Sequence, residues 1–220
     1  MITLERREAV LLLRMDDGEN RMNRAWVDAV NGALDELDAT PDPRALVTTG
    51  SGKFYSNGLD LEWLGTGVED LAGFAAEVEL IFARILSAPY PTVAACNGHT
   101  FAAGAMLAMA HDFRVMRIDR GFFCLPEVDL KIPLTPGMNA LMMSRLPTVT
   151  AHDVLVTGKR FGGEEAAAKG IVSAALPLDE VLPHAMAIAA DLAPKASPTM
   201  GAIKQRMYAE ALGLLRRRLQ

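Results

Sequence analysis

One acidic residue is the strongest candidate for chemistry in this sequence. Glu127 stands in the stretch GFFCLPEVDLKIPL, where its apolar neighbours are Phe123, Leu125, Ile132 and Leu134. An apolar surround raises the pKa of a carboxyl group toward neutrality, which suits a group that must both accept and release a proton. The pattern favours a general acid–base residue, and a carboxylate on a surface loop is the alternative.

Two upstream segments could supply backbone N–H donors for a negatively charged oxygen. In KFYSNGLD, Gly58 can adopt a positive φ and leave the N–H of Leu59 free to donate. In NGHTFAAGA, the small residues from Ala102 to Ala105 begin a helix, whose first N–H groups lack intrahelical partners and suit an oxyanion. An ordinary tight turn and close helix packing are the respective alternatives. Two such donors facing one carboxylate suffice for proton transfer next to a carbonyl.

Strands alternate with helices along the chain, and this order must position the three groups. Alternation with continuous apolar runs indicates an α/β fold with buried, near-parallel strands. Asn23 is expected to cap the first helix, because its side chain can accept an N–H from the first turn. The expected strands are residues 2–8, 9–15, 44–49, 92–96, 113–116, 122–124 and 171–175, and the expected helices are residues 24–38, 68–87, 103–110, 136–145, 151–157, 163–169, 179–192 and 198–220.

Composition limits the classes of function. The net charge of −5 argues against a nucleic-acid binder, which normally needs a basic excess. No apolar run approaches the ~20 residues that span a bilayer, and the charged start MITLERREAV does not resemble a secretory leader, so a cytoplasmic protein is expected. The histidines and two cysteines lack metal-ligand spacing, so no metal site is expected. The glycine patterns of nucleotide-binding loops are missing as well.

Taken in order, these segments resemble the crotonase (enoyl-CoA hydratase/isomerase) superfamily. The resemblance runs from about Ile2 to about Leu192 and includes Ser-Asn-Gly-Leu-Asp, Asn-Gly-x-x-x-Ala-Ala-Gly and Leu-Pro-Glu-Val-Asp-Leu. It continues through LVTGKRF and AAAKGIV. The stretches GKFYSNGLDL and EVDL, followed by Pro133-Leu134, are similar to the monofunctional Δ3,Δ2-enoyl-CoA isomerases of plant peroxisomes.

The resemblance implies a fold and a set of catalytic groups. The fold would be a crotonase-like spiral of ββα repeats over residues 1–192, with a short C-terminal helical segment at 193–220. The oxyanion donors would be the N–H groups of Leu59 and Ala103, although the family usually has glycine at the second place. Hydratases of the family carry two glutamates, and here the first place is Met106 while the second is Glu127. One carboxylate can move a proton from C2 to C4, whereas adding water needs further groups.

The resemblance also implies where the substrate binds. Family members hold CoA with main-chain groups beside the first donor, here Ser56, Gly58 and Asp60, and with the loop at Arg21 and Met22. A basic residue near the C-terminus often reaches the CoA phosphates, sometimes across a subunit boundary, and the candidates are Lys204 and Arg206. The residues expected to line the acyl pocket are Met106, Leu125, Ile132 and Leu134. Six methionines could fill the core or give that pocket an adaptable wall: Met106, Met109, Met116, Met138, Met142 and Met143.

The function expected from the resemblance is a Δ3,Δ2-enoyl-CoA isomerase of fatty-acid metabolism. It would shift the double bond through a dienolate held by two backbone donors and would need no cofactor besides the CoA of its substrate. By analogy it would form a homotrimer or hexamer. Two alternatives stay open: another single-acid reaction, such as thioester hydrolysis or decarboxylation, and a non-catalytic acyl-CoA-binding protein.

Overall fold

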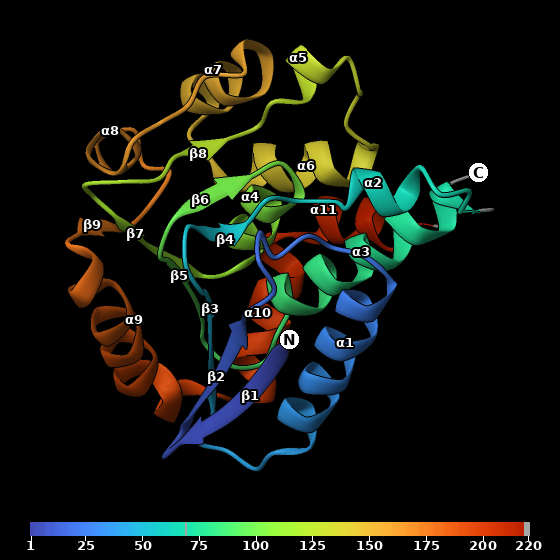
Figure 1. Cartoon of the computed structure of the whole chain (residues 1–220). Helices are drawn as coiled ribbons and strands as arrows, with labels where there is room; N and C mark the ends of the chain where they lie inside the picture. Colours follow the sequence, from blue (N-terminus) through green and yellow to red (C-terminus); the bar gives the residue numbers. More distant parts are fainter. Residues whose placement is uncertain (69, 218–220) are drawn as a thin grey trace.

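The chain forms two sheets, and its middle strands alternate between them. The computed structural model describes residues 1–68 and 70–217 (Figure 1). The larger sheet has the order β1-β2-β3-β5-β7-β9 and the smaller one β4-β6-β8, with every neighbouring pair parallel apart from β1 and β2. The strands are β1 (Ile2–Arg7), β2 (Val10–Met15), β3 (Ala45–Gly50), β4 (Phe54–Ser56), β5 (Thr92–Cys96), β6 (His99–Phe101), β7 (Phe113–Arg117), β8 (Phe123–Cys124) and β9 (Ala174–Leu176).

Three successive repeats build a spiral. The pairs β3–β4, β5–β6 and β7–β8 each place one strand in the larger sheet and the next in the smaller one, and helices follow each pair. This arrangement confirms the expected spiral of ββα repeats. The helices are α1 (Arg24–Ala39), α2 (Leu61–Leu64), α3 (Leu71–Leu86), α4 (Ala103–Ala110), α5 (Glu127–Leu130), α6 (Pro136–Arg145), α7 (Thr148–Thr157), α8 (Gly163–Ala168), α9 (Leu178–Leu192), α10 (Pro198–Met207) and α11 (Ala209–Leu215).

Helices cover both faces of the larger sheet, which explains its continuous apolar strands. In Figure 1, α9 lies on one side of this sheet, while α1 and α3 lie on the other. Successive side chains of a strand point to opposite faces. Accordingly, Val10 and Leu12 pack in the cluster under α9, and Leu11 and Leu13 pack in the main core. The unbroken apolar run of β2 therefore reflects burial on both faces.

The first helix begins where the sequence predicts. The Asn23 side chain accepts a hydrogen bond from the Trp26 N–H at 3.1 Å, which confirms it as the N-cap of α1. The residues Trp26, Val30, Leu34 and Leu37 are buried along one stripe of this helix. Residue 69, in the segment predicted as helix over 68–87, lies outside the described part, and α3 begins at Leu71 after the cap Asp70.

The C-terminal helices pack back onto the core. The predicted single helix from residue 198 is two helices, because Tyr208 leaves helical geometry with φ −114° and lets α11 turn onto α6 and α3. Leu212 and Leu215 of α11 are buried in the main core. Residues 218–220 lie outside the described part, and the division at 192/193 stays a prediction.

Several short elements differ from the expectation. The strand β6 lies where the sequence predicts no strand. The strand β9 begins three residues later than predicted, because Ile171 and Val172 lie in a turn whose N–H groups bond to Ala166. The one-turn helices α2 and α5 have no periodicity to reveal them. Among the described residues, no helix combines the length and apolarity needed to cross a membrane.

Candidate active site

The predicted donors and the predicted acid meet at one cavity. A cavity of about 380 Å³ is lined by Leu59, Ala103 and Glu127, which come from three different ββα repeats. Each residue follows a strand of the smaller sheet: Leu59 follows β4, Ala103 follows β6 and Glu127 follows β8. Because these strands are parallel neighbours, their carboxyl ends bring the three residues to the same edge. The topology therefore assembles the site.

Gly58 allows the two donor segments to touch. Its φ is +84°, and a Cβ built on it would lie 2.9 Å from the Ala102 Cβ and 3.0 Å from the Ala103 nitrogen. A side chain at this position would therefore both strain the backbone and push the start of α4 away. The glycine is needed for the close approach of the two segments.

Hydrogen bonds on either side of Leu59 leave its own N–H free. The Met22 N–H donates to the Gly58 carbonyl at 2.8 Å, and the Asp60 N–H donates to the Met22 carbonyl at 3.0 Å. These bonds form a parallel bridge between Met22 and Leu59. Within the described residues, the N–H groups of Leu59 and Ala103 donate to no other group. Both remain available to a ligand in the cavity.

The start of α4 carries backbone strain. Ala102 has φ 50°, and such values cost a residue with a side chain about 1–3 kcal/mol. Its N–H donates to the Cys124 carbonyl at 3.0 Å, which ties this turn to β8. A Cβ on Gly104 would lie 2.4 Å from the Ser56 carbonyl oxygen, so only glycine lets α4 begin here. The fold thus holds Ala103 in a strained but fixed position at the cavity.

Glu127 faces the cavity with an unpaired carboxyl oxygen. It is the first residue of α5 and is partly buried. Its Oε2 is buried and has no hydrogen-bond partner among the described residues. Burial raises the pKa of Glu127 from 4.5 to about 7, because the charged form is poorly solvated there. The carboxyl group can therefore exist in either protonation state near neutral pH.

Apolar residues form most of the cavity wall. Three of the four residues expected in the acyl pocket line it, namely Met106, Ile132 and Leu134, whereas Leu125 is buried and does not line it. Met138 lines it too, while Met143 is exposed rather than packed in the core. The cavity residues that the sequence did not single out for this pocket are Asn57, Leu61, Glu62, Phe101, Ala102, Pro126, Leu130 and Pro133.

Met106 occupies the place of a second carboxylate. Its side chain is 1% exposed and lines the cavity. The other acid at the cavity, Glu62, lies at the solvent side, where its side chain is 85% exposed and pairs with Arg21 at 3.2 Å. Among the described residues that line the cavity, Glu127 is thus the only carboxylate with a buried oxygen atom.

Arg21 lies at the cavity as the sequence predicts. Its guanidinium pairs with Glu19 at 2.8 Å and with Glu62 at 3.2 Å, and these hydrogen bonds raise its pKa. The Asn57 side chain also bonds to Glu19, at 2.8 Å. A bound phosphate or pantetheine amide would meet a cation that its neighbours already hold in place.

The other residues expected to bind CoA hold the loop itself. The Ser56 hydroxyl donates to the Asn20 carbonyl at 2.7 Å and accepts the Gly58 N–H at 3.2 Å. Asp60 caps α2 by accepting the Trp63 N–H at 3.1 Å. These side chains, and that of the buried Met22, do not line the cavity. Any contact that they make with CoA would come from their backbone groups.

Lys204, a candidate for contact with the CoA phosphates, does not line this cavity. Its Nζ is 2.6 Å from the Asp112 carboxylate and donates to the Tyr90 carbonyl at 2.8 Å. The residue is 7% exposed, and burial lowers its pKa. Its nearest cavity is a different one, beside α10. The ammonium group is committed to a buried ion pair, and the alternative candidate, Arg206, is exposed on α10.

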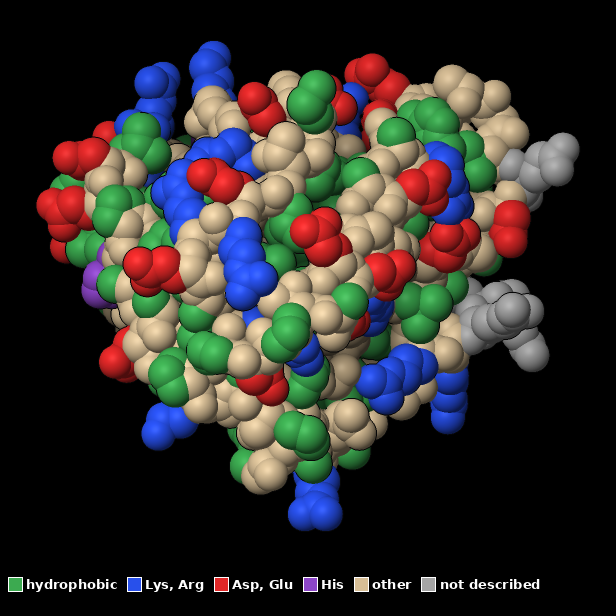
Figure 2. All heavy atoms as spheres, turned by 90° about the horizontal axis from the view of Figure 1, so that it is seen from below, with side chains coloured by type: hydrophobic (Ala, Val, Ile, Leu, Met, Phe, Trp, Pro, Cys, Tyr) green, Lys and Arg blue, Asp and Glu red, His purple; other side chains and the backbone are tan. Residues whose placement is uncertain are grey.

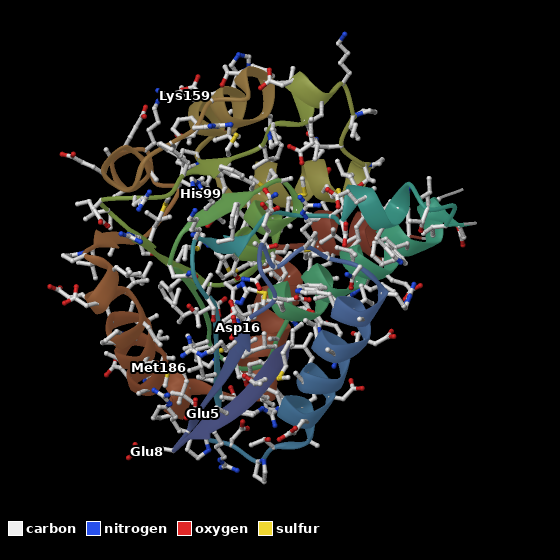
Figure 3. All side chains as sticks on the ribbon, viewed as in Figure 1. Glu5, Glu8, Asp16, His99, Lys159 and Met186 are labelled. Carbon is white, nitrogen blue, oxygen red and sulfur yellow. The ribbon has the colours of Figure 1, made fainter. Side chains whose placement is uncertain are left out.

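His99 and the other possible metal ligands among the described residues form no metal site. His99 lies on β6 (Figure 3), where its ring packs against Phe54, Phe101 and Phe122, and burial is the largest cause that lowers its pKa. Among the described residues, no three histidine, cysteine or acidic side chains are grouped to hold a metal ion. Acidic and basic side chains are interspersed on the face shown in Figure 2.

Comparisons with known proteins agree with this geometry. The family model described as enoyl-CoA hydratase/isomerase matches residues 5–219. The chain is 34% identical to a protein named enoyl-CoA delta isomerase 2, peroxisomal, from Arabidopsis thaliana, over 98% of this chain and 95% of that one. It is 32% identical to a putative enoyl-CoA hydratase of Thermus thermophilus, over 91% and 80% of the two chains.

Solved structures show the same fold. An apo enoyl-CoA isomerase of Mycobacterium tuberculosis superposes with a TM-score of 0.90 at 29% identity, covering 98% of this chain and 94% of that one. The family model spans almost the whole sequence, and these two relatives exceed 30% identity over 95% and 80% of their own lengths. The chain therefore belongs to the enoyl-CoA hydratase/isomerase family, that is, to the crotonase superfamily.

Proposed function

We propose that the protein is a Δ3,Δ2-enoyl-CoA isomerase. One observation carries the proposal. Among the described residues, the cavity is lined by a single partly buried carboxylate, Glu127, together with the free N–H groups of Leu59 and Ala103, and Met106 stands where a hydratase would have its other glutamate. Relatives named enoyl-CoA delta isomerase, at 32–36% identity, support it. Relatives named as hydratases are also similar to this chain, so the choice between isomerase and hydratase rests on the residues of the cavity.

The proposed reaction begins with the thioester of a 3-enoyl-CoA. Its carbonyl oxygen accepts hydrogen bonds from the N–H groups of Leu59 and Ala103. Ionised Glu127 removes a proton from C2, and the electron pair of the C–H bond moves toward the carbonyl to form a dienolate. The two donors stabilise the negative charge on the oxygen, and each such donor is worth roughly 2.7–4 kcal/mol in known enzymes.

Glu127 then completes the transfer. Its carboxylic acid donates the proton to C4, the double bond settles between C2 and C3, and 2-trans-enoyl-CoA forms with the carboxylate regenerated. A pKa of about 7 suits both halves of the cycle, because general catalysis is most efficient when the pKa lies near the working pH. Protons and electrons balance without any cofactor besides the CoA of the substrate.

Hydration would require more than this cavity offers. Adding water across a double bond needs groups that orient the water and handle its protons. The thioether of Met106 is at best a weak hydrogen-bond acceptor, and it cannot exchange protons. The apolar residues around it favour an acyl chain over an ordered water molecule. A double-bond shift therefore fits the residues better than hydration does.

Binding and assembly are part of the same proposal. We expect Arg21 and the backbone at Ser56, Gly58 and Asp60 to contact CoA, and Lys204 to have no part in this. The family analogy suggests a homotrimer or hexamer, and we retain a cytoplasmic location as the expectation from sequence.

Incubation of the purified protein with 3-cis- and 3-trans-enoyl-CoA tests the proposal. Formation of 2-trans-enoyl-CoA would support it. Free CoA, release of carbon dioxide from a carboxylated acyl-CoA, or 3-hydroxyacyl-CoA as the main product would each replace it with another reaction of the family. Tight acyl-CoA binding without turnover would indicate a binding protein.

A further inference from the structure

A second buried carboxylate lies behind the cavity, and the proposed mechanism does not use it. Glu79 of α3 is 0% exposed, and its Oε2 has no hydrogen-bond partner among the described residues. Burial raises its pKa, whereas the Thr135 hydroxyl and the Met138 N–H lower it. A buried carboxyl oxygen without a partner costs stability, and an apolar residue of similar size would avoid this cost.

Glu79 contacts the beginning of α6. The Thr135 hydroxyl donates to Glu79 Oε1, and the same hydroxyl caps α6 by accepting the Met138 N–H at 3.1 Å. A Cβ on Gly137 would lie 3.0 Å from Glu79 Oε2 and 3.0 Å from the Leu215 Cα, so α3, α6 and α11 meet here without spare room. The carboxyl group also complements the positive end of the α6 dipole.

The opposite side of this segment is the cavity wall. Pro133, Leu134 and Met138 line the cavity, and they bracket Thr135. Met138 connects the two sides, because its N–H donates to the Thr135 hydroxyl and Met138 itself lines the cavity. A shift of the first turn of α6 would therefore move the apolar surface that faces an acyl chain.

We propose that Glu79 is a positioning residue that fixes the wall formed by Pro133, Leu134 and Met138 and thereby determines which acyl-chain lengths the cavity accepts. This role presupposes that the cavity is the acyl-CoA site proposed above. Glu79 acts through Thr135 and does not touch the substrate. A rigid wall excludes chains that outgrow the cavity, since well-packed interiors do not deform continuously. Releasing the wall favours longer chains.

Two substitutions remove the contact that fixes the cavity wall, and two others serve as controls. Glu79→Leu removes the acceptor of the Thr135 hydroxyl, and Thr135→Val removes the hydroxyl itself. Glu79→Gln keeps a side-chain oxygen that can accept the Thr135 hydroxyl. Glu77→Gln is the matched control, because Glu77 lies on the same helix but pairs with Arg24 at the surface, with 2.9 Å between Arg24 Nη2 and Glu77 Oε1.

The measurement is the dissociation constant of each variant for hexanoyl-, decanoyl- and tetradecanoyl-CoA. We expect Glu79→Leu and Thr135→Val to shift the ratio of long-chain to short-chain affinity about tenfold toward the long chain, the scale of one misfitted methylene group. Glu79→Gln and Glu77→Gln should keep the ratio of the wild type. With 3-enoyl substrates, the same shift should appear in KM, while kcat on the shortest substrate changes little.

Several results would overturn this role. An unchanged ratio in folded Glu79→Leu and Thr135→Val would do so, as would an equal weakening for all chain lengths, which is what a purely structural role predicts. An equal shift in Glu77→Gln would also contradict it. If Glu79→Leu fails to fold, the ratio of long-chain to short-chain affinity in Thr135→Val tests the role of Glu79. The saturated ligands are not turned over, so a protein that binds them with length selectivity but lacks isomerase activity would refute the proposed function and leave this role standing.

Discussion

Replacing Glu127 by glutamine should stabilise the protein, and the gain should depend on pH. The pKa of Glu127 is raised from 4.5 to about 7, so the folded state holds this proton more tightly than the unfolded state does. Below pH 4.5 the carboxyl group is protonated in both states and has little effect. As the pH rises through 7, the unfolded chain has lost the proton, and the folded protein must ionise a poorly solvated group.

The size of the effect follows from this difference in pKa. Each unit of pKa difference corresponds to about 1.36 kcal/mol of unfolding free energy. An increase from 4.5 to about 7 therefore amounts to about 3 kcal/mol above pH 7. Glutamine has nearly the same shape and does not titrate. The free energy of unfolding of Glu127→Gln minus that of the wild type should therefore increase between pH 4.5 and 7 and be constant above.

Urea unfolding at a series of pH values measures this difference directly, because it yields the free energy of unfolding at each pH. Glu62→Gln is the matched control: its carboxylate is also at the cavity, but the side chain is 85% exposed. We expect that control to show no comparable gain at high pH. If Glu127→Gln raises the free energy of unfolding equally at pH 5 and pH 8, the desolvation account is refuted. The cost of burying the charge exists only at a pH where the carboxyl group is ionised.

Three further predictions follow from individual contacts. Gly58→Ala should lower kcat about 10²–10³-fold, because the new Cβ would press on the Ala103 nitrogen and disturb an oxyanion donor. A wild-type kcat in this variant would contradict the assignment of Ala103 as a donor. Lys204→Met should lower the free energy of unfolding by about 3 kcal/mol, because Asp112 loses its counter-ion and, among the described residues, keeps only the N–H and hydroxyl of Thr92 as donors. Calorimetry should show an unchanged affinity for CoA, and a large loss of that affinity would restore the role expected from sequence. Burial lowers the pKa of His111 from 6.5 to about 3. The free energy of unfolding should therefore fall below pH 6.5 by up to about 1.4 kcal/mol per pH unit, because the unfolded chain binds a proton that the folded protein does not. An equally steep loss in His111→Gln would rule out this residue as the source.

The sequence was sufficient for the residues whose roles depend on local structure. Gly58 and the small residues around Ala103 indicate a close backbone approach, and the apolar neighbours of Glu127 indicate a raised pKa. The family resemblance supplied what local patterns cannot, namely that the three segments share one cavity and that Met106 replaces a carboxylate.

Long-range pairings were beyond the sequence. Lys204 and Asp112 are 92 residues apart, and nothing near either one indicates that they form a buried ion pair. The three-residue strand β6 is too short to show a period. Glu79 could have been noticed, because it shares helical spacing with the buried residues Phe82 and Leu86 of α3. A charged residue on a buried stripe is a signal of a special contact, although the partner at Thr135 becomes visible only in the structure.

The most direct test of the central claim is the turnover of 3-enoyl-CoA by Glu127→Gln, with acyl-CoA binding measured in parallel. Our account predicts that kcat falls by at least about 10²–10⁴-fold while the dissociation constant for a saturated acyl-CoA stays near that of the wild type. Isomerisation by Glu127→Gln at the wild-type rate would show that another group moves the proton from C2 to C4.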